Sequence, residues 1–596
     1  MRLILKVFLV AASLAGASAA NAQAGVSYEP PAVDFVEPGE APVPLVAASG
    51  GVAVPEGAVP MQEPSIGPNA DAPRPRLRVD VGAYVELNQG VSVELAGNGP
   101  GDDVVTYTAV AAGVEGQVRT RRVTASGAYR YERRLGWTED LPDEDVHSGI
   151  AQAHAELVPG RVSVDAGALA ARTGGTGRAV GVTDREAGTE IYSAYAGPTL
   201  STRAGPVQIN AAYRLGYVHV DDDSLSGAAA PTDDFDSTVH VANASVGIAP
   251  GEALPIGLSA NAGYVREDSG ALDNRFEGRF VRADAVVPVS PTFAVTAGVG
   301  YSRTEASQQD VQRGPGGVPL RDANGRLSAD PTRPRVTTLD TDGVYWDAGI
   351  LWRPTPRAEI QVRAGQDDDG DMLVMGSATV QIGRRAGISA TVFDHDTSFG
   401  QGTISSLRRL PAAFNTNPDP LRERSFGDCV FGDEPGQGGC LASSLQSISS
   451  ISFRARGGSL VFTSTGRLWN IGAGLAYTHR SFYLPDDPLF ASVFAREDED
   501  LSGFLYVSRR LTRDITLTLN PYFSFYDNEF DVGLGGGLGG LGAFGDGFST
   551  GTSFGISRSF LSNRLQLLLT LGINYSTLRD DDSLVADGLI GVRYVF

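Results

Sequence analysis

Residues 588–596, GLIGVRYVF, end the chain on an alternation that is typical of a β-strand. Alternate side chains of a strand point to opposite faces, so every second residue belongs to one face. One of these faces is wholly apolar and ends in a ring: Ile590, Val592, Tyr594 and Phe596. An apolar strand at an exposed sheet edge invites aggregation. The rest of the sequence must therefore supply something that covers this face.

The composition favours strands and turns throughout the chain. The 596 residues include 74 Gly and only 4 Met, and the mean hydropathy is -0.08. The net charge of -22 and the pI near 4.7 argue against nucleic acid as a partner, because phosphate binding requires a basic surface.

The N-terminal region predicts export followed by a linker. Residues 1–22 combine two basic residues, a short apolar run and small residues before the expected cleavage site, which is typical of a secretory signal peptide. Residues 23–75 hold a proline every few positions, which disfavours helix and central strand. We expect a disordered periplasmic linker there. No later stretch reaches about 18 continuous apolar residues, so we expect no transmembrane helix.

Residues 76–596 predict one large antiparallel β-barrel. Segments of alternating residues follow one another, as in PVQINAAYRLGYV at 206–218 and DITLTLNPYFSFYD at 514–527. Their length suits strands that cross a bilayer at a tilt, which takes about 9–11 residues. We count about 22 strands, with a range of about 18–24, in keeping with the even numbers of such barrels. Lipid then covers the apolar faces, and pairing of the first and last strands removes both edges.

The connections between these segments support the same fold. Short ones such as PGR at 159–161 and TGR at 465–467 alternate strictly with long ones, among them 305–341 and 398–449. Short turns on one side and long loops on the other are typical of outer-membrane barrels. Barrels of this size suggest TonB-dependent transporters, which carry a folded plug domain before the barrel. Residues 23–75 are too few and too rich in proline for a plug. Two interpretations of the long loops 305–341 and 398–449 stay open: they fold inward as a constriction, or they stay outside as display elements.

Several arginines fall on the predicted inward face of the strands: Arg130, Arg134, Arg214, Arg282, Arg363 and Arg564. Two interpretations remain open for them. The arginines pair with inward carboxylates and stiffen the wall, or they line a wet, mildly cationic path for polar or anionic solutes. A barrel of about 22 strands is too wide for its own wall side chains to fill, so it must be plugged or must conduct.

The remaining motifs predict no catalytic site and no cofactor. Cys429 and Cys440, the two cysteines of the chain, lie close in sequence, and an oxidising compartment favours a disulfide between them. Acidic runs, which we place in the long loops, include DDDGD at 367–371, EDED at 497–500 and RDDDS at 579–583. They indicate a solvated rim, with weak divalent cation binding as the alternative. The GxGxxG spacing within 533–547 lacks a following helix and indicates a loop, not a nucleotide site.

The C-terminus resembles the signal by which the outer-membrane assembly machinery recognises its substrates, carried here by Gly591, Tyr594 and Phe596. The chain as a whole resembles the outer-membrane β-barrel porin family of alphaproteobacteria, a family sometimes found beside exopolysaccharide genes. Residues 76–175, with RLRVDVGAYVELNQGVSVEL and DVHSGIAQAHAELVPGRVSVDAG, carry this resemblance. The resemblance implies a barrel with a passive transport or export role, and it brings no assigned catalytic residues.

We therefore expect a non-enzymatic channel in the outer membrane of a Gram-negative bacterium. It would serve passive or facilitated passage of polar solutes, or export of polysaccharide. The alternative is a loop-plugged structural or surface-binding barrel whose acidic loops contact ions, a surface layer or a partner. The expected partners are membrane lipid and lipopolysaccharide, the assembly machinery, and a small polar solute or polysaccharide.

Overall fold

The computed structural model describes residues 78–97, 104–137, 143–173, 189–221, 235–270, 272–315, 317–322, 326–415, 429–432, 436–441, 445, 448–487, 496–529, 547–578 and 581–596. The predicted signal peptide, the predicted linker and the GxGxxG stretch lie outside these residues.

Within the described residues, twenty-two strands form one sheet. In chain order they are β1 (Arg78–Gly97), β2 (Val104–Arg119), β3 (Val123–Gly136), β4 (Glu144–Val158), β5 (Val162–Thr173), β6 (Thr189–Ala204), β7 (Val207–Asp221), β8 (Phe235–Ile248), β9 (Gly257–Ser269), β10 (Asn274–Ser290), β11 (Phe293–Gln308), β12 (Val336–Thr355), β13 (Ala358–Gln366), β14 (Met372–Ile382), β15 (Ala386–Thr397), β19 (Phe453–Thr465), β20 (Trp469–Phe482), β21 (Glu497–Arg510), β22 (Ile515–Glu529), β23 (Gly547–Phe560), β24 (Leu565–Leu578) and β25 (Asp581–Val595). The predicted count is confirmed.

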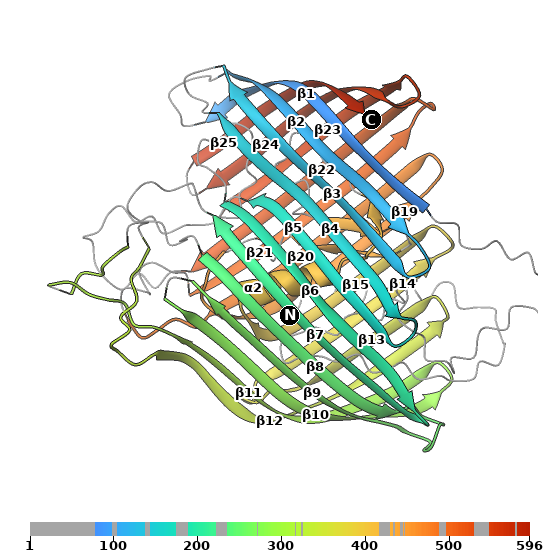
Figure 1. Ribbon diagram of the computed structural model, residues 1–596, viewed down its shortest axis with the longest axis vertical. Helices are drawn as coiled ribbons and strands as arrows, with labels where there is room; N and C mark the ends of the chain where they lie inside the picture. Colours follow the sequence, from blue (N-terminus) through green and yellow to red (C-terminus); the bar gives the residue numbers. More distant parts are fainter. Residues whose placement is uncertain are drawn as a thin grey trace, which may run out of the picture.

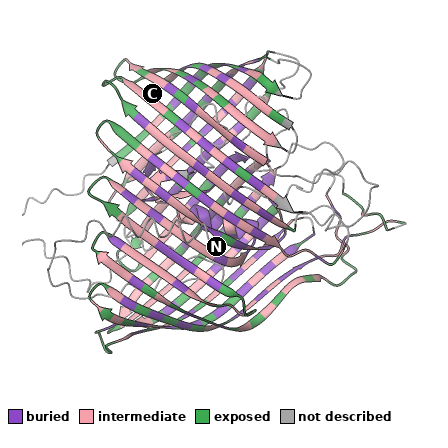
Figure 2. Ribbon diagram, turned by 180° about the vertical axis from the view of Figure 1, so that it is seen from behind, coloured by how far each residue is buried: buried purple, intermediate pink, exposed green. Residues whose placement is uncertain are grey.

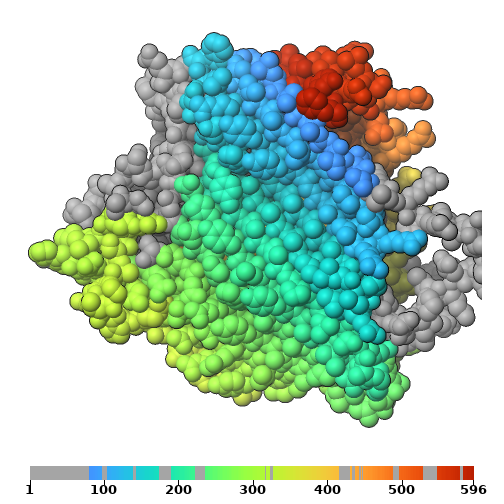
Figure 3. All heavy atoms as spheres, in the orientation of Figure 1, coloured from blue at the N-terminus to red at the C-terminus, as the bar shows by residue number. Residues whose placement is uncertain are grey.

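The sheet closes on itself between its first and last strands. β1 pairs with β25 in antiparallel register from Tyr84 opposite Val595 to Gly97 opposite Ser583. Figure 3 shows the two strands side by side on the surface, blue against red. The backbone N–H of Phe596 donates to the Ala83 carbonyl at 2.9 Å, so pairing continues to the last residue. Closure leaves no open edge along this seam, as a lipid environment requires.

Burial alternates along the strands in the way the sequence predicts (Figure 2). On β1, Glu86 and Asn88 are buried, whereas Val85 and Leu87 between and beside them are exposed. Exposed apolar side chains of this kind occur on strands all around the barrel: Val81, Leu215, Val281, Val299, Leu569, Leu571 and Ile590. The apolar face of the last strand therefore points outward, where lipid covers it.

The connections predicted to be short, such as 159–161 and 290–292, lie at one end of the barrel. The prediction that they alternate strictly with long loops is wrong at three places, because 270–273, 367–371 and 579–580 are also short. Three acidic runs are accordingly not in long loops: DDDGD forms the short connection 367–371, EDED starts β21, and Asp581 starts β25. In EDED, the buried Asp498 and Asp500 alternate with Glu497 and Glu499 as strand residues do, so the acidic character alone misled the prediction there.

Residues 398–452 connect β15 to β19, and their described parts contact the inner side of the barrel. They contain the helix α2 (Phe399–Arg408) and a small sheet of β16 (Phe414–Asn415), β17 (Cys429–Gly432) and β18 (Gly438–Cys440). Figure 1 shows α2 within the ring of strands. We call residues 398–452 the lumen segment. Among the described residues, no helix is long and apolar enough to cross a membrane.

Candidate functional site: the lumen and the segment that crosses it

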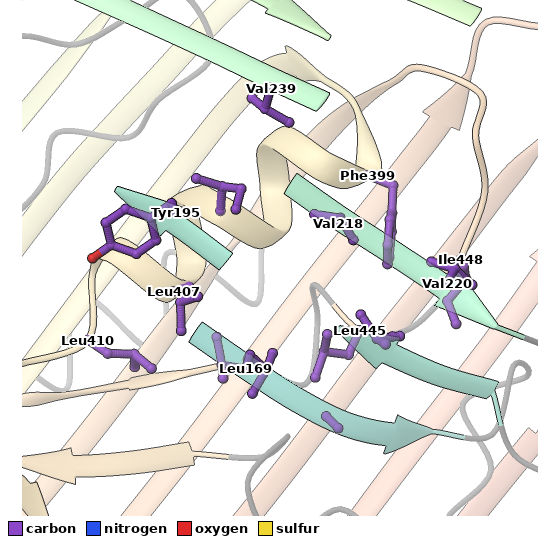
Figure 4. Close-up of a cluster of buried hydrophobic side chains, with 14 of the residues drawn as sticks. Leu169, Tyr195, Val218, Val220, Val239, Phe399, Leu407, Leu410, Leu445 and Ile448 are labelled. Carbon is purple, nitrogen blue, oxygen red and sulfur yellow. The ribbon is translucent and has the colours of Figure 1, made fainter. Parts of the chain in front are cut away.

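The helix α2 lies against the inner face of β5–β8. Its Phe399, Ile404 and Leu407 pack with inward side chains of these strands, among them Leu169, Ile191, Val218, Val220 and Val239 (Figure 4). Burial of an aliphatic side chain such as Leu407 contributes roughly 1.5–3 kcal/mol. An apolar patch on the lumen side of a barrel wall is unusual, and here α2 covers it.

The N-terminus of α2 is capped by a residue of the wall. Ser398, the N-cap residue, makes no capping bond with its own side chain. Instead Glu267 of β9 accepts hydrogen bonds from the backbone N–H groups of Gly400, at 3.2 Å, and Gln401, at 2.8 Å, and from the Ser398 hydroxyl. The carboxylate thus satisfies donors that a helix start leaves unpaired.

The lumen segment extends from this wall to the opposite one. At the first wall it also contacts β3 and β4. The Leu407 carbonyl accepts from Gln152 of β4 at 2.5 Å, and the Ala412 carbonyl accepts from Ser126 of β3 at 2.5 Å. Further along the segment, the N–H of Gly436 donates to the hydroxyl of Thr463 on β19 at 2.7 Å. The segment therefore crosses the barrel from β3–β9 to β19.

The small sheet is fixed at this second wall. Phe431 of β17 stacks on Phe504 of β21, with ring centroids 6.2 Å apart. An added Cβ on Gly472 of β20 would lie 2.5 Å from the Phe431 ring, so glycine makes room for that ring. Cys440 is disulfide-bonded, and Cys429, the other cysteine of the chain, lies directly opposite it in the β17–β18 register.

A second segment, residues 309–335 between β11 and β12, stays outside the barrel. We call it the arm, and Figure 1 shows it projecting from the end that carries the long loops. Its Val311 and Leu327 pack with Leu272 and with Ile451 of the lumen segment. Arg313 of the arm pairs with Asp487 of the connection between β20 and β21. The arm thus covers part of the mouth above the lumen segment.

Five of the six arginines predicted to face inward lie on the inner wall, and each is paired. Arg130 binds Glu86 and Glu132, Arg134 binds Glu132 and Glu144, and Arg214 binds Asp165. Arg282 and Arg363 share Asp284 and Asp347 at 2.6–3.2 Å, and side-chain exposure in this group is only 1–6%. Such pairing favours the first interpretation, in which arginines stiffen the wall, because each carboxylate offsets a guanidinium charge.

The sixth arginine, Arg564, does not lie on the wall. It is exposed in the turn between β23 and β24, where its N–H donates to the Leu561 carbonyl. The prediction that it lines the lumen is corrected. The alternation of β24 begins only one residue later, so parity placed Arg564 in a strand that had not yet started.

The acidic runs hold a mixture of paired and crowded carboxylates. Asp498 of EDED points inward and accepts from Arg480 at 2.7 Å. In the turn 367–371, Asp367 accepts from Arg454 at 2.7 Å. Burial, together with the neighbouring Asp368 and Asp367, raises the pKa of Asp369. Within the described part of the chain, no three His, Cys, Asp or Glu side chains are placed to hold a metal ion.

The sequence did not single out Glu267, the residue that anchors α2. Its inward parity on β9, between the buried Val265 and Ser269, was a readable signal. Its partners stand 131–134 residues further along the chain, and no local pattern links them.

No family model and no curated protein matches the sequence. Among solved structures, the ferric-catecholate import receptor Fiu from E. coli K12 is similar, with 11% identity over 87% of this chain and 82% of that chain and a TM-score of 0.41. The FrpB iron transporter from Neisseria meningitidis has 11% identity over 86% and 81% of the two chains and a TM-score of 0.42. The siderophore receptor PiuA from Acinetobacter baumannii has 9% identity over 86% and 82%, with a TM-score of 0.38.

Similarity at this level assigns the chain to no receptor family. The closed ring of strands with an apolar outer face and a polar inner face establishes the coarser conclusion. The chain is an outer-membrane β-barrel of a Gram-negative bacterium.

Proposed function

We propose that the barrel is a channel for polar solutes and that the lumen segment is its constriction. The observation that carries this proposal is the path of the lumen segment from the wall at β3–β9 to the wall at β19–β21. A 22-stranded barrel is too wide to be closed by wall side chains, so a segment inside it narrows the path.

The charges of the wall favour uncharged polar solutes over anions. Arg282, Arg363, Asp284 and Asp347 form a group in which guanidinium and carboxylate charges balance. From β22 to β24 the buried polar side chains of the inner face are uncharged: Asn520, Ser524, Ser549, Ser553 and Thr570. Passage of small polar solutes and export of a polysaccharide, which the resemblance to the porin family suggests, both fit such a wall.

Single-channel conductance of the refolded protein in a planar bilayer tests the proposal. We expect stable ohmic steps from the wild type, and larger steps after reduction, because reduction frees the β17–β18 pair that narrows the lumen. The variant in which Cys429 and Cys440 are both replaced by serine is the matched control. Its steps should be large from the start and indifferent to reductant. A barrel that is folded by heat-modifiable gel mobility yet carries no current overturns the channel proposal.

The second candidate is a loop-plugged, surface-binding barrel. The observation in its favour is the apolar contact of the arm with the lumen segment at the mouth, formed by Val311, Leu327 and Ile451. This candidate predicts silence in the bilayer both before and after reduction. Weak divalent cation binding by the acidic connections stays a prediction under either function.

A further inference from the structure

The turn between β9 and β10 joins two segments that are distant in sequence. We call residues 269–274 the β9–β10 turn. It contacts the arm on one side and the lumen segment on the other, and both contacts include charged or tightly packed groups. The β9–β10 turn therefore holds both the arm, at the mouth of the barrel, and the lumen segment.

On the arm side, Arg335, the last residue of the arm, is hydrogen-bonded to the turn. Arg335 donates to the carboxylate and to the backbone carbonyl of Asp273, each at 2.5 Å. It also donates to the Ser307 hydroxyl at 3.2 Å and to the Ser307 carbonyl at 3.0 Å, which ties it to the end of β11. At the start of the arm, the N–H of Gln309 donates to the Leu272 carbonyl at 2.8 Å.

On the lumen side, the exit of the lumen segment is held by the same turn. Asn274 donates to the Ser450 hydroxyl at 3.0 Å. Gly270 adopts a positive φ of 73°, and an added Cβ there would lie 2.9 Å from the Ser450 Cβ, so the two backbones are in close contact. Leu272 packs in one buried cluster with Ile451 and with Val311 and Leu327 of the arm.

The entry of the lumen segment is anchored two residues before the turn. Glu267, which caps α2, is separated from Ser269 by a single residue on β9. Entry and exit of the lumen segment are therefore both fixed at one hairpin, and the arm is fixed there as well.

We propose that the β9–β10 turn couples the arm to the lumen segment, so that displacing the arm loosens the constriction. The inference rests on the proposed function for its consequence in conductance, but the coupling itself is independent of current. Coupling between two sites is reciprocal in free energy. Loosening α2 must therefore also loosen the arm.

Hydrogen exchange of the full-length barrel in detergent, followed by mass spectrometry, tests the coupling. In Arg335→Ala we expect α2 amides, residues 399–408, to exchange roughly three- to tenfold faster than in the wild type, which is the effect of losing about one ordinary hydrogen bond. In Glu267→Gln we expect faster exchange in the arm, residues 326–335. Arg335 is hydrogen-bonded to Asp273 and Ser307, and Glu267 is hydrogen-bonded to the start of α2. Each expected effect must therefore be transmitted through the β9–β10 turn.

Arg333→Ala is the matched control, because the ion pairs that Arg333 makes in the described structure are with Asp310 and Asp330, both in the arm itself. Its α2 amides should exchange as in the wild type. Unchanged α2 exchange in Arg335→Ala, or equal acceleration by both arginine variants, overturns the proposal. If Arg335→Ala does not fold, Asp273→Asn replaces the charged acceptor of Arg335 by a neutral amide and should give a smaller acceleration of α2 exchange; no acceleration there overturns the proposal.

Conductance of the same variants separates this inference from the proposed function. Faster α2 exchange with a larger conductance in Arg335→Ala supports both. Faster exchange in a barrel that carries no current supports the coupling and rejects the channel. Wild-type exchange in a conducting barrel rejects the coupling and leaves the channel intact.

Discussion

On the inner face of β13, Arg363 donates to Asp284 at 2.7 Å and to Asp347 at 3.2 Å, and all three side chains are almost completely buried. Removing charges from water is costly, and here the pairing of opposite charges offsets that cost. The alternation of the strands explains why the three residues share a face. It does not explain why they meet, because Asp284 is 79 residues from Arg363 in the chain.

Replacing Arg363 by alanine should lower the free energy of unfolding by about 3–5 kcal/mol, since it leaves buried carboxylates with only one cation. The urea midpoint of unfolding in detergent measures this loss. Arg357→Ala is the control, because Arg357 is exposed in the turn between β12 and β13. A similar loss in both variants would contradict the assigned role of Arg363.

Asp369 offers a pH-dependent prediction in the turn 367–371. Burial and neighbouring aspartates raise its pKa, so the folded state holds this proton more tightly than the unfolded state does. The stability of the wild type therefore decreases as the pH rises through the window above the ordinary value of about 3.9. We expect Asp369→Asn to raise the melting temperature at neutral pH and to have no such effect near pH 3. A gain that is independent of pH would contradict this account.

The helix α2 is stabilised by the strands β5–β8 that it packs against, more than by its own sequence. Its ten residues, FGQGTISSLR, include two glycines and three hydroxyl residues, which are poor helix formers. A helix of this length is unstable alone in water. The apolar stripe of β5–β8 and the cap by Glu267 supply what the local sequence lacks.

Gly216 of β7 leaves the space that α2 occupies. An added Cβ would lie 2.7 Å from Cγ1 of Ile404, so Gly216→Val should displace α2 from the wall. We expect faster hydrogen exchange of α2 and a larger single-channel conductance. Gly402→Ala is the control: an added Cβ there meets no atom within 4 Å, so α2 should stay in place. Unchanged exchange in Gly216→Val would show that the wall tolerates a larger side chain.

At the scale of the whole molecule, the net charge of -22 does not describe the lumen. Inward arginines are paired with inward carboxylates, and the negative surplus includes runs in the connections and at the strand ends. A balanced wall attracts neither sign of ion strongly.

We therefore expect a cation-to-anion permeability ratio near one, measured as the reversal potential in a potassium chloride gradient. Asp587→Asn removes one inward charge while keeping the shape of a side chain that accepts from Ser92 and Asn574. It should shift the reversal potential toward anions. Strong anion selectivity of the wild type would instead favour the cationic path.

The sequence by itself determined the barrel, the direction of its strands and the face that meets lipid. These features follow from a period of two, which is local and repeats along every strand. The same parity placed Arg130, Arg134, Arg214, Arg282 and Arg363 on the inner face, and it failed at Arg564, where a turn interrupts the period. The assembly role of Gly591, Tyr594 and Phe596 stays a prediction.

Only the tertiary structure showed which segment lies in the lumen. The lumen segment has no strand or helix period strong enough to reveal its place, and Glu267, Gly216 and Ser126 meet it across 131–288 residues of sequence. Contacts of this kind depend on the closed ring, which brings distant strands around one space. A local pattern reports which way a side chain points, and only the closed ring decides what it meets there.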